Sequence, residues 1–285
     1  MTGEDSLPPL REVLATYGIL PRKSLGQNFI FDLNLTRRIA REAKIAGVVV
    51  YEVGPGPGGL TRALLSEGAA QVIAIERDRR AIPALKQIDA AWPERLRVIE
   101  GDALKLDEEQ ELTARGAKLP LPVVANLPFN MGTALLVKWL SCAWTPWWSS
   151  LTLMFQKEVA ERICAKSGDV AYGRLSVLAQ WRSTARVLFQ VSRQAFIPPP
   201  DVTAAVLRLE PLPAPRYPAE FRDLEKITAA AFGQRRKMLR SSLKPLISDP
   251  DALLAATGIA PTQRAEELSV EQFCALAQAY RSAAL

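Results

Sequence analysis

Short apolar runs alternate with segments of helical periodicity over most of the chain before residue 210. The apolar runs predict strands at residues 47–53, 71–75, 96–100, 122–125 and 151–156. The periodic segments predict helices at residues 32–44, 60–67, 79–88, 133–140 and 157–166. This alternation is typical of βαβ units, so we expect an α/β fold built on a parallel sheet. Two consecutive strands expected at 183–190 and 203–209 indicate an antiparallel hairpin at one edge of that sheet.

The pattern changes after Leu209. Prolines at positions 211, 213, 215 and 218 predict a stiff linker, and from Glu220 onward the periodicity is helical. The sequence therefore predicts two domains: an α/β domain at residues 1–209 and a small all-helical domain at residues 210–285.

The composition narrows the chemistry. The chain has no histidine, which removes the commonest general base, the usual catalytic triads and most metal sites. Cys142, Cys164 and Cys274 are far apart and form no C-x-x-C pair, so neither a zinc site nor a disulfide framework is expected. We therefore expect no metal, and a reducing compartment fits the cysteine usage.

Charge and hydropathy bear on partners and location. The formal charge of +6 and a pI of about 9.3 permit a phosphate-bearing partner without requiring one. Met1–Leu10 lacks the basic start and apolar stretch of a signal peptide. The most membrane-like window, residues 134–155, is interrupted by Lys138 and Pro146. We expect a cytoplasmic protein without a membrane segment.

Three features at consecutive strand ends predict a nucleoside site. Gly54 and Gly56, in the glycine-rich segment 52–61, let the backbone approach a ligand at the carboxyl end of the first strand. Glu76 ends the second strand, where a carboxylate can accept hydrogen bonds from ribose hydroxyls, and Asp102 follows the third, near an adenine amino group. Each feature alone is also compatible with a tight turn, a helix cap or a solvated charge. Their combination is hard to explain by structure alone.

The same features bear on the identity of the cofactor. Recognition of adenosine and ribose, without a pyrophosphate-binding helix terminus, suits S-adenosylmethionine better than NAD. The loop does not exclude NAD by itself, since Gly54, Gly56 and Gly59 follow the dinucleotide spacing. The later motifs exclude it.

The segment from Val124 to Phe129 is a further candidate site. A buried strand stops at Asn126, Pro128 stiffens the backbone after Leu127, and Phe129 follows. Amide and carbonyl acceptors beside an aromatic ring suit one planar, amino-bearing base. An ordinary strand-to-loop turn has a similar composition, and the cofactor features nearby favour the base-holding interpretation.

Seven segments in this order resemble the small-subunit rRNA adenine dimethyltransferases. They cover the chain from about residue 18 to about residue 280, and the string of motifs is highly specific. The segments are residues 23–29 (KSLGQNF), 52–61 (EVGPGPGGLT), 126–129 (NLPF), 156–159 (QKEV), 171–176 (AYGRLS), 196–200 (FIPPP) and 231–237 (AFGQRRK).

The resemblance implies a Rossmann-like methyltransferase sheet followed by a small helical domain. It implies dimethylation at N6 of two adjacent adenines in the 3′-terminal hairpin loop of small-subunit (16S) rRNA, with S-adenosylmethionine as donor and a role in small-subunit biogenesis. The expected partner is rRNA within a pre-assembled small subunit, and we expect a monomer. The cofactor-binding positions carried over from the family are Asn28, Ile30, Gly54, Glu76, Asp102 and Asn126. This chain departs from the family pattern at Ile30, usually Leu, and at Phe129, usually Tyr.

The expected mechanism needs no histidine. Asn126 Oδ1 and the Leu127 carbonyl would accept hydrogen bonds from the adenine amino group. These bonds would raise the electron density on its nitrogen and hold it in line with the methyl group. Phe129 and Phe196 are the candidates for stacking on the two faces of the base. The alternative for Phe196 is a core anchor before the proline run.

A basic run, residues 233–244, is the candidate for rRNA phosphate contacts. We expect a helix on which Arg235, Arg236, Lys237 and Arg240 face outward while Met238, Leu239 and Leu243 pack inward. Such a run is equally often only a solvated face. Arg22, Lys23, Arg37, Arg38 and Arg41 would extend the basic surface near the cofactor entrance.

Three other functions stay open on the sequence. A large-subunit rRNA adenine methyltransferase is disfavoured by the matching C-terminal segment. An N6-adenine DNA methyltransferase would favour an Asp-Pro-Pro-Tyr type of motif. A non-catalytic RNA-binding assembly factor is disfavoured by the intact set of Glu76, Asp102 and Asn126.

Overall fold

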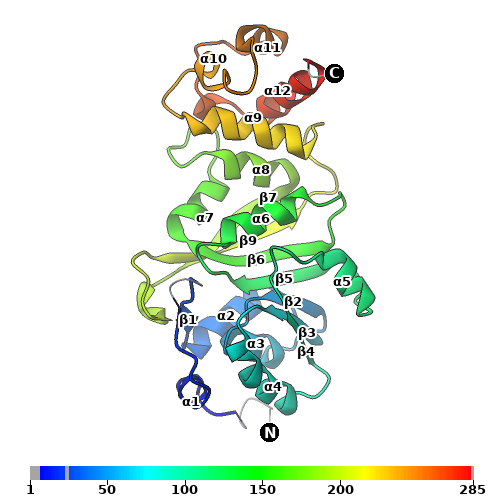
Figure 1. Cartoon of the computed structure of the whole chain (residues 1–285), viewed down its shortest axis with the longest axis vertical. Coiled ribbons are helices and arrows are strands. Elements are labelled where there is room, and N and C mark those ends of the chain that lie inside the picture. The colour runs from blue at the N-terminus through cyan, green and yellow to red at the C-terminus, as the bar shows by residue number, and fades with distance from the viewer. Residues whose placement is uncertain (1–6, 23–25, 284–285) are drawn as a thin grey trace. The chain divides into compact units, whose positions relative to one another are not determined.

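The computed structural model describes residues 7–22 and 26–283, so Lys23, Ser24 and Leu25 of the first quoted segment lie outside the described residues. Its centre is a seven-stranded sheet in the order β4-β3-β2-β5-β6-β9-β7 (Figure 1). The strands are β2 (Val49–Val53), β3 (Gln71–Glu76), β4 (Leu96–Glu100), β5 (Leu121–Asn126), β6 (Trp148–Gln156), β7 (Ser183–Val191) and β9 (Ala204–Pro211). All seven predicted strands are present. The two late ones, β7 and β9, are neighbours at one edge.

The register of the parallel strands brings their carboxyl ends together. β2 pairs in parallel with both β3 and β5, β3 pairs with β4, and β5 pairs with β6. Glu76 lies opposite Glu100, so the ends of β3 and β4 are level. The parallel sheet predicted from the alternation is confirmed, and its carboxyl edge is the place where a ligand is expected.

Helices follow the strands at positions close to those predicted. They include α2 (Leu33–Glu42), α3 (Gly59–Ser66), α4 (Ile82–Ala91), α6 (Gly132–Ser141) and α7 (Lys157–Cys164). Asp32 begins α2, because its side chain accepts hydrogen bonds from the backbone N–H groups of Asn34 and Leu35. The helices α1 (Leu10–Thr16), α5 (Glu108–Ala114) and α8 (Arg174–Arg182) were not predicted, nor was the short antiparallel pair β1 (Phe29–Ile30) and β8 (Phe196–Ile197).

The chain divides into two compact units. One comprises residues 1–138, 146–157 and 187–208; the other comprises residues 139–145, 158–186 and 209–285. The last segment of the second unit thus begins beside the expected boundary at 209 and 210, and two earlier segments join it. The division into two separately folding domains, residues 1–209 and 210–285, stays a prediction.

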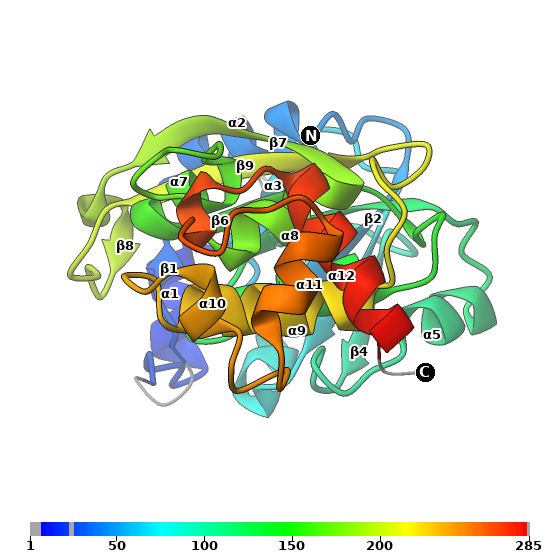
Figure 2. The ribbon, with the colours of Figure 1, turned by 90° about the horizontal axis from the view of Figure 1, so that it is seen from above.

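The C-terminal part of the second unit is helical. α10 (Leu239–Ser242) and α12 (Val270–Ala283) pack against α9 (Phe221–Gly233), and α11 (Pro250–Ala256) packs against α10 and α12 (Figure 2). Apolar residues along α9 and α12, among them Leu224, Ile227, Phe273 and Leu276, are buried and form the core of this bundle. No helix within the described residues has both the length and the apolar character needed to cross a bilayer.

Candidate active site

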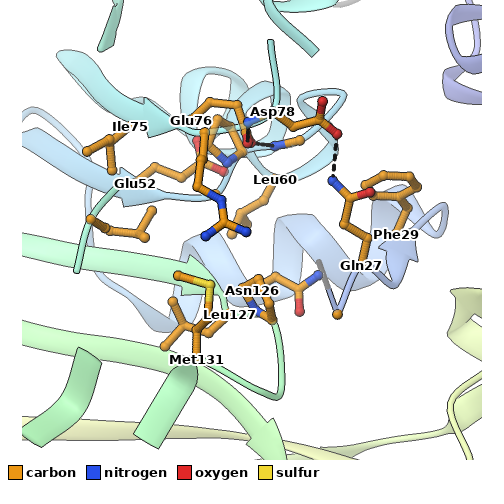
Figure 3. A pocket seen from close by; sticks show the side chains of 18 of the residues that line it. Gln27, Phe29, Glu52, Leu60, Ile75, Glu76, Asp78, Asn126, Leu127 and Met131 are labelled. Carbon is orange, nitrogen blue, oxygen red and sulfur yellow. Dashed lines mark hydrogen bonds between the residues drawn. The ribbon is translucent and has the colours of Figure 1, made fainter. Parts of the chain in front are cut away.

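A pocket opens at the carboxyl edge of the sheet, within the first unit. Ten residues expected at the cofactor or the target base line it: Asn28, Ile30, Gly54, Gly56, Glu76, Asp102, Asn126, Leu127, Pro128 and Phe129. Figure 3 shows Glu76 and Asn126 pointing toward this pocket from the ends of β3 and β5, the two strands that flank β2. The carboxyl ends of β2, β3 and β5, together with the loop after β4, therefore bring these side chains to one place.

Glu76 is fixed by the glycine-rich loop. Its Oε2 accepts a hydrogen bond from the Gly56 N–H at 2.8 Å, and its Oε1 accepts one from the Asp78 N–H at 2.7 Å. Gly56 has a φ of 55°, and a Cβ there would stand 3.1 Å from the Phe29 ring, so a side chain at this position would be strained. Burial raises the pKa of Glu76, and the hydrogen bonds from Asp78 and Gly56 counteract this rise. The carboxylate is rigid and retains acceptor sites for ribose hydroxyls.

Glu52, at the carboxyl end of β2, is another buried acid of the pocket. Its Oε2 accepts a hydrogen bond from Thr61 Oγ1 at 2.7 Å, and its Oε1 has no hydrogen-bond partner among the described residues. Burial raises the pKa of Glu52 to about 8, with a smaller contribution from Glu76. A buried carboxyl group with one unmet oxygen favours a cationic or hydrogen-bond-donating ligand.

Asp102 lies in the loop after β4 and is half-buried. Its Oδ1 accepts a hydrogen bond from the Leu104 N–H at 3.0 Å, and its Oδ2 lies 3.4 Å from Arg77 Nη1. Lys138 from α6 supports this loop by donating to the carbonyls of Ala103 and Leu106. Asp102 therefore stands at the expected place, with Arg77 beside it on the wall of the pocket.

The candidate base-holding turn, residues 126–129, leaves two acceptors available. Asn126 Nδ2 donates to the Asn28 carbonyl at 3.2 Å, and since that carbonyl can only accept, Oδ1 is the atom left for a ligand. The Pro128 carbonyl closes the turn by accepting from the N–H groups of Met131 and Gly132. No donor within the described residues is bonded to the Leu127 carbonyl.

The two aromatic candidates differ in position. Phe129 is half-buried and lines the pocket. Phe196 is only 1% exposed, does not line the pocket and belongs to the apolar core, where β8 pairs it with Ile30 of β1. The expected stacking role of Phe196 is therefore wrong for this structure. Phe196 packs in the core beside β1, in agreement with the alternative interpretation of this residue as a core anchor.

The basic run is not the expected helix. Residues 234–237 form a turn between α9 and α10, and Met238 bridges to Arg264 and is exposed, whereas Leu239 and Leu243 are buried as expected. Arg236, Lys237 and Arg240 are exposed. Arg235 is half-buried, donates to the Val170 carbonyl at 2.6 Å and lies 4.0 Å from Glu266. Three of the four predicted phosphate contacts are thus accessible, and Arg235 also has a structural role.

Comparison with known proteins shows the family to which this chain belongs. The sequence model of the family described as "Ribosomal RNA adenine dimethylase" matches residues 20–282. The chain belongs to this family. A relative from Paracoccus denitrificans, named Ribosomal RNA small subunit methyltransferase A, is 57% identical over 99% of each chain. A relative of the same name from Azorhizobium caulinodans is 60% identical over 98% of this chain and 95% of its own.

Solved structures agree with the fold of this family. A dimethyladenosine transferase from Plasmodium falciparum has a TM-score of 0.69 at 24% identity, covering 90% of this chain and 98% of its own. The 23S rRNA methyltransferase ErmE has a TM-score of 0.62 at 24% identity, covering 89% of this chain and all of its own. At these identities the likeness shows the fold alone: the Rossmann-like methyltransferase sheet followed by a helical part.

S-adenosylmethionine is the methyl donor of this dimethylase-family chain, and the pocket fits it. The donor carries a sulfonium and an ammonium group, and the lining supplies Glu52 with its unmet oxygen and the buried Glu76. A pyrophosphate group would instead meet these two carboxyl groups. Glu76 would hold the ribose hydroxyls, Asp102 the adenine amino group, and the Gly54–Gly56 backbone would pass along the ligand.

Sequence reasoning missed several lining residues, notably Gln27, Glu52 and Asp78. Glu52 was within reach, because it is the first residue of the quoted glycine-rich segment. Asp78 had only a weak signal, an acid two positions after Glu76. Its carboxylate accepts a hydrogen bond from Gln27, which is 51 positions away in the chain, so a local pattern does not contain this contact.

Proposed function

We propose that this enzyme transfers methyl groups from S-adenosylmethionine to N6 of two adjacent adenines in the 3′-terminal hairpin loop of small-subunit rRNA. The observation that carries this is the Asn126 amide, whose Oδ1 is left available beside the cofactor pocket because Nδ2 donates to the Asn28 carbonyl. The names of the relatives at 57% and 60% identity support the small-subunit rRNA as substrate.

The residues act by holding the base rather than by removing its proton first. The adenine amino nitrogen is a poor nucleophile, because its lone pair is delocalised into the ring. In the first transfer, Asn126 Oδ1 and the Leu127 carbonyl accept the two N–H groups, orient the lone pair and raise the electron density on the nitrogen. In the second transfer the nitrogen has one N–H left, which one of the two acceptors holds. Phe129 stacks on the ring, a contact worth about 1–3 kcal/mol per base. When bound, S-adenosylmethionine supplies the electrophilic methyl group, and the methylated nitrogen afterwards releases its proton to water or a carbonyl.

The wider setting follows from the substrate. The enzyme acts as a monomer on a pre-assembled small subunit in the cytoplasm, where the hairpin loop presents unstacked bases. Arg236, Lys237 and Arg240 contact rRNA phosphates, with Arg235 as a partly structural neighbour. Methylation of isolated rRNA at the same rate as of assembled subunits would contradict the subunit requirement, and a dimer in sedimentation would contradict the monomer.

The test is methylation of unmethylated small subunits with labelled S-adenosylmethionine, followed by mapping of the modified nucleotides. Asn126→Ala should lower the transfer rate about 100- to 1,000-fold, the range seen when one positioned hydrogen-bonding group is removed from a reacting centre. Cofactor binding, measured by calorimetry, should change far less.

The matched control is Asn130→Ala. Asn130 is exposed, lies in the same turn and does not line the pocket, so its replacement should leave the rate within about twofold of wild type. Near wild-type dimethylation by Asn126→Ala would refute the assignment of this residue. A wild-type protein that binds subunits but transfers no methyl groups would favour the assembly-factor alternative.

A further inference from the structure

The carboxyl group of Asp78 joins two distant stretches of the chain beside the cofactor pocket. It accepts hydrogen bonds from Gln27 Nε2 at 2.9 Å and from Arg80 at 2.9 Å (Nε) and 2.6 Å (Nη2). Figure 3 shows the Gln27–Asp78 bond at the rim of the pocket. Burial would raise the pKa of Asp78, but the hydrogen bonds from Arg80 and Gln27 outweigh it and hold the pKa at about 2. The group is therefore a permanent carboxylate with every partner a donor.

The same cluster fastens the segment that precedes β1. Arg80 Nη1 donates to the Leu20 carbonyl at 3.1 Å. Gln27 uses both ends of its amide, because Oε1 accepts from the Arg22 N–H at 3.1 Å while Nε2 donates to Asp78. An ionised, mostly buried acceptor makes the strongest hydrogen bonds available here, so the position of Gln27 is tightly set.

The next residue carries this constraint to the reacting centre. Asn28 follows Gln27, and its carbonyl accepts the hydrogen bond from Asn126 Nδ2. That bond decides which end of the Asn126 amide faces the pocket. Without it, the amide is free to rotate and present Nδ2, a donor, to the adenine amino group. The backbone of Asp78 is also bonded, because its N–H donates to Glu76 Oε1. Asp78 therefore contacts both Glu76 and the segment of Gln27 and Asn28 that orients Asn126.

We propose that Asp78 is a positioning residue for methyl transfer, which acts through Gln27 and the Asn28 carbonyl to keep Asn126 Oδ1 turned toward the target adenine. The inference rests on the proposed function of Asn126. It assigns Asp78 no contact with the reacting atoms. Its removal should therefore lower the rate of transfer more than it weakens cofactor binding.

The experiment measures single-turnover methylation of unmethylated small subunits by Asp78→Asn, a substitution that keeps the shape and removes the charge. We expect a fall of about 10- to 100-fold in rate, the scale of a small misplacement of a catalytic group, with the cofactor dissociation constant within about threefold of wild type. Asp107→Asn is the matched control, since Asp107 caps α5 and lies outside the cluster, and its rate should stay within about twofold.

A double-mutant cycle separates positioning from general weakening. In an Asn126→Ser background the amide is gone, so adding Asp78→Asn should cost less than about twofold more, because residues that act as a unit are not additive. A full additional loss in that background would overturn the proposal. If Asp78→Asn does not fold, Gln27→Met serves instead. It removes the link to Asp78 together with the hydrogen bond that Gln27 Oε1 accepts from the Arg22 N–H. The same fall in rate and the same non-additivity are expected.

The wild type is assayed in parallel, which keeps the two proposals distinguishable. If the wild type transfers no methyl groups to rRNA, the proposed function fails whatever the variants do. If it does, and Asp78→Asn or Gln27→Met transfers them equally fast, only the positioning role of Asp78 fails.

Discussion

The two edges of the parallel sheet carry opposite kinds of ionisable side chain. The carboxyl edge holds the pocket with four acids: Glu52, Glu76, Asp78 and Asp102. The amino edge has a hollow of its own, within the same unit, lined by five cations and by no carboxylate among the described residues. These cations are Lys44, Arg97, Arg115, Lys118 and Arg208. By charge alone, the amino edge is as good a candidate for a ligand site as the carboxyl edge.

Three of the five cations of the amino edge are engaged within the protein: Arg208 and Arg97 by backbone carbonyls and Arg115 by the Glu111 carboxylate. Arg208 is buried, and its Nη1 donates to the carbonyls of Glu42 and Ala43 at 3.1 and 2.9 Å, at the end of α2. Arg97 Nη1 donates to the Arg115 carbonyl at 3.0 Å, at the end of α5. Cations are favourable at helix C-termini because they meet carbonyls that have no partner within the helix. The contacts of Arg208 and Arg97 are thus explained by the fold.

The carboxyl edge is not explained in that way. Glu52 has an oxygen without a partner among the described residues, and burial raises the pKa of both Glu52 and Glu76. A fold gains nothing by burying acids that prefer to be protonated, whereas a site for a cationic cofactor does. The comparison teaches that unmet hydrogen bonding, rather than charge, marks the functional edge.

The largest effect is expected for a substitution at the carboxyl edge, at Glu76. Glu76→Gln should weaken S-adenosylmethionine binding about 100-fold, because charge-assisted hydrogen bonds to the ribose are lost and an amide cannot accept equally from the Gly56 N–H. Isothermal titration calorimetry measures this. Glu100→Gln is the control, since Glu100 is paired with Glu76 in the sheet but is exposed. An unchanged dissociation constant for Glu76→Gln would remove the ribose acid from the site.

Much of the carboxyl edge was predictable because parallel strands align their ends. Glu76 and Asp102 could be placed from strand boundaries alone, and the pocket gathers them as expected. Phe196 could not, because its burial depends on pairing with Ile30, far away in the sequence. The helix expected over the basic run failed for a similar reason: Met238 bridges to Arg264, a contact that local periodicity does not contain. Sequence patterns therefore predict strand ends well and tertiary pairings poorly.

A smaller effect is expected at the amino edge. Arg208→Met should lower the free energy of unfolding by about 2 kcal/mol, because two carbonyls at the end of α2 lose a charged donor in a buried place. The cofactor dissociation constant should not change. Chemical denaturation and calorimetry measure the two quantities. Arg97→Met, which removes one exposed contact, should cost less than about 1 kcal/mol. Weaker cofactor binding in Arg208→Met would show that the two edges are not independent.

The smallest effect concerns the pH dependence of stability, and it tests whether burial at the carboxyl edge disfavours ionisation of Glu52. The pKa of Glu52 is about 8 in the folded protein, above its usual value of 4.5, because the group is buried. Between these pH values the unfolded chain has released a proton that the folded chain retains, so this group makes the folded state less stable as pH rises. From pH 7 to pH 8 its contribution should fall by about 1 kcal/mol.

Glu52→Gln should remove that slope, whereas Glu100→Gln should keep it, as measured by denaturation at each pH. Saturating S-adenosylmethionine should also flatten the wild-type slope, since its positive charges favour the ionised carboxylate. Equal slopes for wild type and Glu52→Gln would mean that Glu52 is already ionised in the folded protein, and the contrast between the two edges would then rest on Glu76 alone.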